Sequence, residues 1–141
     1  QALLVEECGE PFAAPGAGEL CRTFPGARVL AQSSLRFLPA ATAESIRAAA
    51  QTVAAARPNA PPDDLLLKLR VIAGVDESAI EYVAMRALND SDALPAESPE
   101  LRNALGDISS TGDLLRRAES WKPWRAYAAV LLMGAGSQSL R

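Results

Sequence analysis

Few residues of this chain could support metal or nucleophilic chemistry, and their types exclude several classes of function. The 141 residues include two cysteines, Cys8 and Cys21, and no histidine. A zinc site of the usual kind needs several cysteine or histidine ligands, a four-cysteine iron-sulfur site is equally out of reach, and no Ser-His or Cys-His pair can form. We therefore expect no metal site and no catalytic triad, and we expect free thiols in a cytoplasmic protein.

A tight turn at residues 72–76 is the second feature with chemical potential. Its sequence is Ile72-Ala73-Gly74-Val75-Asp76, and helices are expected on both sides of it. A helix-turn-helix unit with a glycine-centred turn can present backbone amides to an anion such as a phosphate. The alternative is a plain connection between two helices.

A cluster of aromatic residues follows near the end of the chain. Both tryptophans and one of the two tyrosines fall in Trp121-Lys122-Pro123-Trp124-Arg125-Ala126-Tyr127, although only 5% of residues are aromatic. Pro123 suits a first helical turn, which predicts a helix start near Lys122. Spacings of three and four predict a buried stripe, formed by Trp121, Trp124, Tyr127, Ala128 and Leu131. The apolar run ends at Gly134 and is too short to span a membrane.

The elements that position these residues are all expected to be helices, because alanine, leucine and arginine dominate and β-branched residues are sparse. The expected helices cover residues 1–8, 27–32, 42–57, 63–71, 78–88 and 113–119, with another that starts at Ser98 and Pro99 and a last one that starts near residue 122. The expected caps are Thr42, Asp63 or Asp64, Ser78 with Glu81 in a capping box, Ser98 with Pro99 after it, and Ser110 or Thr111. Ile46, Ala49, Ala50 and Val53 are the expected buried stripe of the long helix.

Length and charge limit the organisation and the partners. We expect one helical domain over residues 1–141, with helical segments 1–57 and 63–134 joined by a Pro-rich linker at 58–62. The net charge of -3 and the pI near 5.0 provide no global basic field, so any DNA contact must be local. The start lacks a methionine and opens abruptly in a helical segment, so we expect the chain to begin inside a longer protein.

The order of three motifs resembles the 3-methyladenine DNA glycosylase II family of the helix-hairpin-helix superfamily. They are the hairpin at 72–88, with Glu81-Tyr82-Val83-Ala84-Met85-Arg86-Ala87-Leu88, the Leu-Pro loop at 94–102, and the Trp-x-Pro-Trp-Arg-x-Tyr segment at 121–127. Weaker matches at 9–56 extend the resemblance over most of the chain. The resemblance implies an all-α helix-hairpin-helix glycosylase fold, incomplete here because the family's N-terminal sheet domain and wedge helix would lie upstream of Gln1.

The resemblance also implies the chemistry of the family. Such enzymes extrude a damaged nucleotide into a pocket where the base stacks on aromatic side chains. An aspartate facing the sugar stabilises the oxocarbenium-like transition state. The hairpin holds a DNA phosphate, often with a bound monovalent cation. The implied partner is double-stranded DNA, and other domains of a longer chain are expected as well.

This sequence departs from the family pattern where the chemistry should lie. Ser98 occupies the catalytic aspartate position and is interpreted as a helix cap. Glu97, next to it, has the negative charge to replace that aspartate, but a shift of one residue turns its side chain by about 100° around a helix. In the base pocket, Ser78 and Met133 stand where the family has tryptophans, so Tyr82 alone remains aromatic. In the hairpin, Gly74 and Val75 match, but Asp76 replaces a glycine at the end where a phosphate would bind, which predicts weak DNA binding.

Three functions compete on these observations. The first is a glycosylase-like domain of base-excision repair whose catalysis is impaired or lost, and this interpretation is favoured. The second is an active 3-methyladenine DNA glycosylase that uses Glu97 or a rearranged carboxylate. The third is a helical scaffold without a DNA role. For Arg86, Arg102 and Arg125 we favour structural pairing with carboxylates over contacts with phosphates.

Overall fold

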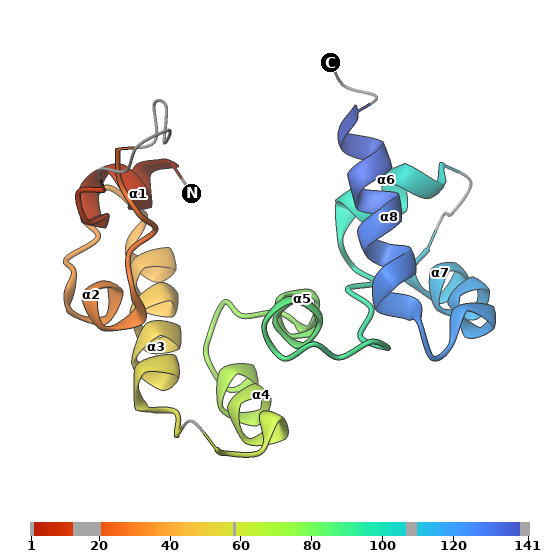
Figure 1. Ribbon diagram of the computed structural model, residues 1–141, viewed down its shortest axis with the longest axis horizontal. Helices are drawn as coiled ribbons and strands as arrows, with labels where there is room; N and C mark the ends of the chain where they lie inside the picture. Colours follow the sequence, from red (N-terminus) through yellow and green to blue (C-terminus); the bar gives the residue numbers. More distant parts are fainter. Residues whose placement is uncertain (1, 13–20, 58, 107–109, 139–141) are drawn as a thin grey trace. The chain divides into compact units, whose positions relative to one another are not determined.

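The computed structural model describes residues 2–12, 21–57, 59–106 and 110–138, and these residues are helical without any strand (Figure 1). The elements are α1 Ala2–Cys8, α2 Ala27–Gln32, α3 Ala40–Ala55, α4 Pro62–Arg70, α5 Glu77–Ala87, α6 Pro99–Leu105, α7 Thr111–Ala118, the 3-10 turn η1 Glu119–Trp121, and α8 Arg125–Gln138. The all-α prediction is confirmed. None of the helices in these ranges combines the length and the apolar character that a membrane crossing requires.

The chain forms two compact units, residues 1–74 and 75–141. In the first unit α2 packs against α3, and α3 also contacts α4. Its core consists of Leu30, Leu35, Ala43 and Ala50. Partly buried side chains of α1, including Leu4 and Cys8, pack against this core, and Cys8 and Cys21 are both free thiols. The single domain and its linker at 58–62 stay predictions, and Pro58 lies outside the described residues.

Helix starts in the first unit differ from the predicted caps. α3 begins at Ala40 after Pro39, which places Thr42 inside the first turn. α4 begins at Pro62, so Asp63 and Asp64 lie in its first turn, where carboxylates favour the positive end of the helix dipole without capping it. Proline at or just before a helix start removes one of the amides that would lack a partner, and neither start has a side-chain cap. The stripe of α3 is also partly wrong, because Val53 is exposed and Ala43 is buried.

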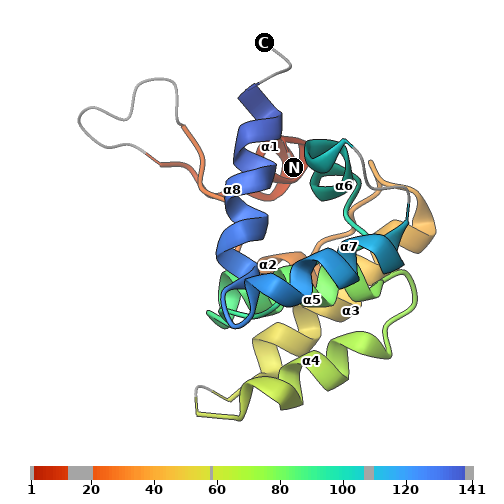
Figure 2. The same cartoon turned by 90° about the vertical axis from the view of Figure 1, so that its right-hand side faces the viewer.

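The second unit comprises α5 to α8 (Figures 1 and 2), and α6 packs against α8. Fully buried Ile80, Leu101 and Leu114 are its largest aliphatic core side chains. Ser98 and Ser110 cap α6 and α7, accepting hydrogen bonds from the amides of Leu101 and Asp113 respectively. Both caps agree with the sequence prediction. Together these helices fix the loop at 88–98 that leads into the candidate site.

The buried stripe predicted for α8 is wrong. Trp124, Tyr127 and Leu131 are 58%, 61% and 74% exposed, whereas Ala126 and Ala129 of the same helix are buried. The helix starts at Arg125, after a cis Lys122–Pro123 bond, so Pro123 lies before the helix rather than in its first turn. Small side chains allow α8 to approach α6 closely. The alanine face therefore packs inward, and the aromatic face points away from the core.

Candidate active site

A cavity of about 640 Å³ in the second unit brings together six of the eight site residues expected from the sequence. They are Asp76, Ser78, Tyr82, Glu97, Ser98 and Met133. The start of α5 forms one wall, the loop before α6 and the first turn of α6 form another, and Met133 of α8 completes the lining. Positions that are far apart in the sequence thus surround one space.

Ser98 lies at the N-terminal end of α6 and is 8% exposed. Its Oγ accepts a hydrogen bond from the amide of Leu101 at 3.4 Å and donates one to Oε2 of Glu100 at 2.6 Å. The cap interpretation of this residue is therefore correct. A neutral hydroxyl with both interactions in place supplies no negative charge of its own to the cavity.

Glu100 is a lining residue that the sequence analysis missed. The hydrogen bond from Ser98 and a backbone hydrogen bond hold the pKa of its carboxyl below the usual range. The available signal was an acidic residue two positions after a capping serine, inside the first turn of a helix. That pattern is common in helices generally and does not reveal where the carboxylate points.

The aromatic content of the cavity is low. Tyr82 on α5 is 48% exposed, and Met133 on α8 is partly buried. Ser78, partly buried, has no ring to offer a base. One aromatic face and one thioether thus line the cavity, where the family pattern implied by the resemblance has three aromatic side chains around a flipped base.

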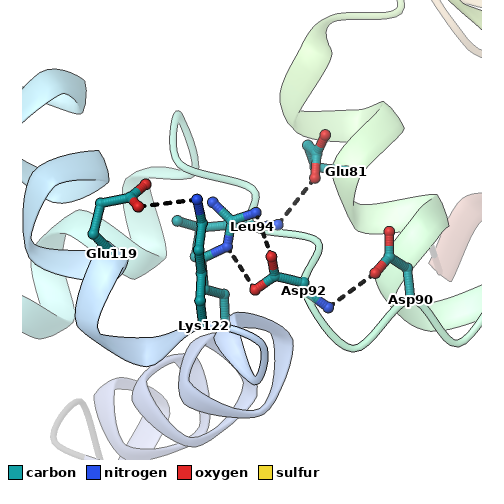
Figure 3. Close-up of polar contacts among 7 residues, drawn as sticks. Glu81, Asp90, Asp92, Leu94, Glu119 and Lys122 are labelled. Carbon is teal, nitrogen blue, oxygen red and sulfur yellow. Dashed lines mark hydrogen bonds and ion pairs between the residues drawn. The ribbon is translucent and has the colours of Figure 1, made fainter.

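Asp76, rather than Ser78, caps α5. Its Oδ1 accepts a hydrogen bond from the amide of Ala79 at 2.8 Å, and Ser78 lies in the first turn. Glu81, the expected partner in a capping box with Ser78, instead accepts a hydrogen bond from the amide of Leu94 at 3.0 Å (Figure 3). The capping-box prediction is wrong because Asp76 caps the helix two residues earlier, which places Ser78 inside the first turn. Its carboxylate also occupies the end of the helix that an anion would use.

The hairpin turn has the expected glycine geometry at Gly74, with φ of +84°. A Cβ at this position would lie 2.6 Å from Oγ of Ser45, and that hydroxyl donates a hydrogen bond to the carbonyl of Ala73 at 2.6 Å. A monovalent cation at this turn would depend on its carbonyl oxygens. Ser45 donates a hydrogen bond to one of them, the carbonyl of Ala73, which leaves that oxygen one lone pair for such an ion.

The loop between α5 and α6 is tied to the aromatic motif by polar contacts (Figure 3). Arg125 forms an ion pair with Asp92, and the amide of Asp92 donates to Oδ1 of Asp90 at 2.9 Å. Lys122 and Glu119 form a more exposed pair at 2.9 Å. The structural pairing predicted for Arg125 is confirmed. Within the described ranges, no group of three or more histidine, cysteine, aspartate or glutamate side chains is arranged to hold a metal ion.

The fold and cavity define an all-helical domain with an acidic, largely non-aromatic site, and no protein-family model matches the chain. Over 64 residues the chain is 39% identical to the "Probable bifunctional transcriptional activator/DNA repair enzyme AlkA" of Mycobacterium tuberculosis strain CDC 1551. The protein of that name from strain H37Rv matches equally. The matched segment is 43% of this chain and 13% of the relative's length. This partial similarity supports the resemblance to DNA glycosylases at the level of the family.

Proposed function

We propose that this chain contains a DNA-repair glycosylase-like domain of the alkylation-repair type whose base release is severely impaired. The observation that carries the proposal is the convergence of Ser78, Tyr82 and Met133 with Ser98 on one cavity. These are the positions at which the resemblance expects base-stacking residues and the catalytic carboxylate. The partial similarity to a DNA repair enzyme supports the same class.

The reaction of such a domain explains why Ser98 matters. The C1′–N bond breaks and its electron pair leaves with the base, while water forms the new C1′–O bond and passes its proton to a carboxylate or to solvent. The sugar carries positive charge in the transition state, and a nearby carboxylate lowers its energy. Ser98 is neutral and its only proton is directed to Glu100, so this stabilisation is absent at position 98.

Affinity for DNA should also be low. Residues 75–141 contain ten acidic and seven basic residues, whereas residues 1–74 contain seven of each, so the net charge of -3 lies entirely in the second unit. The carboxylate of Asp76 adds negative charge at the start of α5. Double-stranded DNA is therefore expected to bind weakly and with a steep dependence on salt concentration.

The test is base release from alkylated duplex DNA, measured for 3-methyladenine and 7-methylguanine. We expect little or no release by the wild-type chain, and a gain of activity when Ser98→Asp is combined with Ser78→Trp. Aspartate is as good a helix cap as serine, so Ser98→Asp should keep α6 intact. Robust release by the unmodified chain would contradict the impairment. If the double variant bound no DNA at all, the glycosylase-like function itself would be wrong.

A further inference from the structure

The hydrogen bonds of Ser98 show which group holds the negative charge beside it. A serine hydroxyl has one proton and two lone pairs. The proton goes to Oε2 of Glu100 at 2.6 Å, and one lone pair accepts from the amide of Leu101. Ser98 therefore has no proton left to donate to a ligand. The negative charge in direct contact with Ser98 belongs to Glu100.

Glu100 is better placed than the other two carboxylates of the cavity. Asp76 is also held, by the amide of Ala79, but it lies at the start of α5, where the resemblance places a DNA phosphate rather than the sugar. Glu97 is exposed, and among the described residues nothing hydrogen-bonds to it or pairs with it to fix its position. Glu100 is also exposed, but the nearly buried hydroxyl of Ser98 holds one of its oxygens. A carboxylate held by a buried donor keeps its direction at a lower entropic cost than a free side chain.

We propose that Glu100, positioned by Ser98, is the anionic group that faces the sugar of an extruded nucleotide in this cavity. This inference rests on the proposed function and gives it a named charged residue. Ser98 is then a positioning residue, and the charge is carried two residues further along the chain than in the family pattern. The low pKa of Glu100 agrees with a carboxylate that stays ionised near neutral pH. Because this charge lies on a longer and more exposed side chain, it stabilises a cationic sugar less than a buried aspartate would.

The test compares two DNA duplexes that bind without any reaction. One contains a protonated pyrrolidine ring in place of a single deoxyribose, which imitates the positive sugar of the transition state. The other contains the neutral tetrahydrofuran ring at the same position. We expect the full 141-residue chain to prefer the pyrrolidine duplex by about fivefold in Kd. The near-isosteric Glu100→Gln variant should lose this preference, and the matched control Glu97→Gln should keep it.

Two further variants test the positioning role of Ser98. Ser98→Thr keeps a hydroxyl and should retain the preference, whereas Ser98→Ala should reduce it. Carbon-13 NMR of the glutamate carboxyls should show the pKa of Glu100 rising toward its ordinary value in Ser98→Ala but not in Ser98→Thr. A Ser98 that acted only as a helix cap would leave that pKa unchanged, which would overturn the positioning role. Far-UV circular dichroism checks that each variant is folded.

The outcomes separate the inference from the function on which it rests. If the wild-type chain binds both duplexes but Glu100→Gln keeps the preference for pyrrolidine, the inference is wrong and the DNA-binding function stands. Loss of the preference in Glu97→Gln instead would assign the charge to Glu97 and overturn the role of Glu100. If neither duplex binds, the proposed function fails and this inference fails with it.

Discussion

Arg125 and Asp92, 33 residues apart in the sequence, form a bidentate ion pair in which Nε donates to Oδ1 at 2.8 Å and Nη2 to Oδ2 at 2.9 Å. The amide of Ala126 adds a second link by donating to the carbonyl of Ser91 at 3.0 Å. The loop before α6 is thereby fastened to the first turn of α8. The arginine of the Trp-x-Pro-Trp-Arg motif thus has a structural role.

Replacing Arg125 should loosen this loop. Arg125→Lys keeps the charge but loses the paired geometry, because an ammonium cannot match both carboxylate oxygens. We expect the melting temperature of the second unit to fall by a few degrees. The control is Lys122→Met, which removes the exposed pair with Glu119 and should change the melting temperature little. If both substitutions lowered the melting temperature equally, the ion pair of Arg125 would stabilise the second unit no more than the exposed pair does.

The ion pair of Arg125 and Asp92 also makes the stability of the protein depend on pH. The hydrogen bond and charge of Arg125 hold the pKa of Asp92 below its usual range. A carboxyl whose pKa is lowered by folding stabilises the protein above its unfolded pKa, and this contribution is lost as the pH falls through the folded value. The midpoint of urea unfolding should therefore stay level from neutral pH down to about pH 5 and decline below about pH 4. Glu100 acts in the same direction, so Asp92→Asn should reduce the decline without abolishing it.

Much of the fold could be predicted from the sequence, because helix caps and stops are local. The short helix at 27–32 was predicted with its observed bounds, and Ser98 and Ser110 were recognised as caps. The buried face of α8 could not be predicted, because Ala126 and Ala129 have the same spacing as the aromatic stripe. Only the tertiary packing of α8 determines which of the two faces is buried. Six residues named from the sequence line one cavity, but the link from Ser98 to Glu100 depends on a side-chain direction that sequence spacing does not determine.

The reversed face of α8 leads to a test by substitution. Ala129 is fully buried, so Ala129→Leu should overpack its surroundings and lower the free energy of unfolding by about 1–3 kcal/mol. Leu131→Ser on the exposed face should change it by less than about 0.5 kcal/mol. Chemical denaturation measures both. If Leu131→Ser were the more damaging change, the aromatic face would be the packed one after all.

Substitutions of Asp76 distinguish its role as a helix cap from the effect of its negative charge. Asparagine caps helices about as well as aspartate, so Asp76→Asn should leave stability nearly unchanged, whereas Asp76→Ala should cost about 1 kcal/mol. Because Asp76→Asn removes one negative charge from the start of α5, it should raise affinity for duplex DNA about twofold at low salt. Fluorescence anisotropy with labelled DNA measures this gain. An unchanged or lower affinity would show that no phosphate approaches this helix end.

Gly74 should tolerate no side chain. Its φ of +84° and the closeness of Ser45 both oppose a Cβ, so Gly74→Ala should destabilise the first unit by about 1–2 kcal/mol. In the double variant Ser45→Ala with Gly74→Ala the close contact with Oγ is gone but the strained dihedral remains. Thermal unfolding of that variant should recover only part of the loss. Complete recovery would mean that the contact, and not the backbone, is the obstacle.

The aromatic motif also places the fluorescent side chains of the chain in the second unit. Trp121, Trp124, Tyr82 and Tyr127 all lie in residues 75–141, and residues 1–74 contain only phenylalanines among the aromatic types. Tryptophan fluorescence therefore follows unfolding of the second unit alone, while far-UV circular dichroism follows the helices of both. Coincident transitions by the two methods would mean that the units unfold together. A fluorescence transition displaced from the dichroism would give the second unit a stability of its own, measurable without labels.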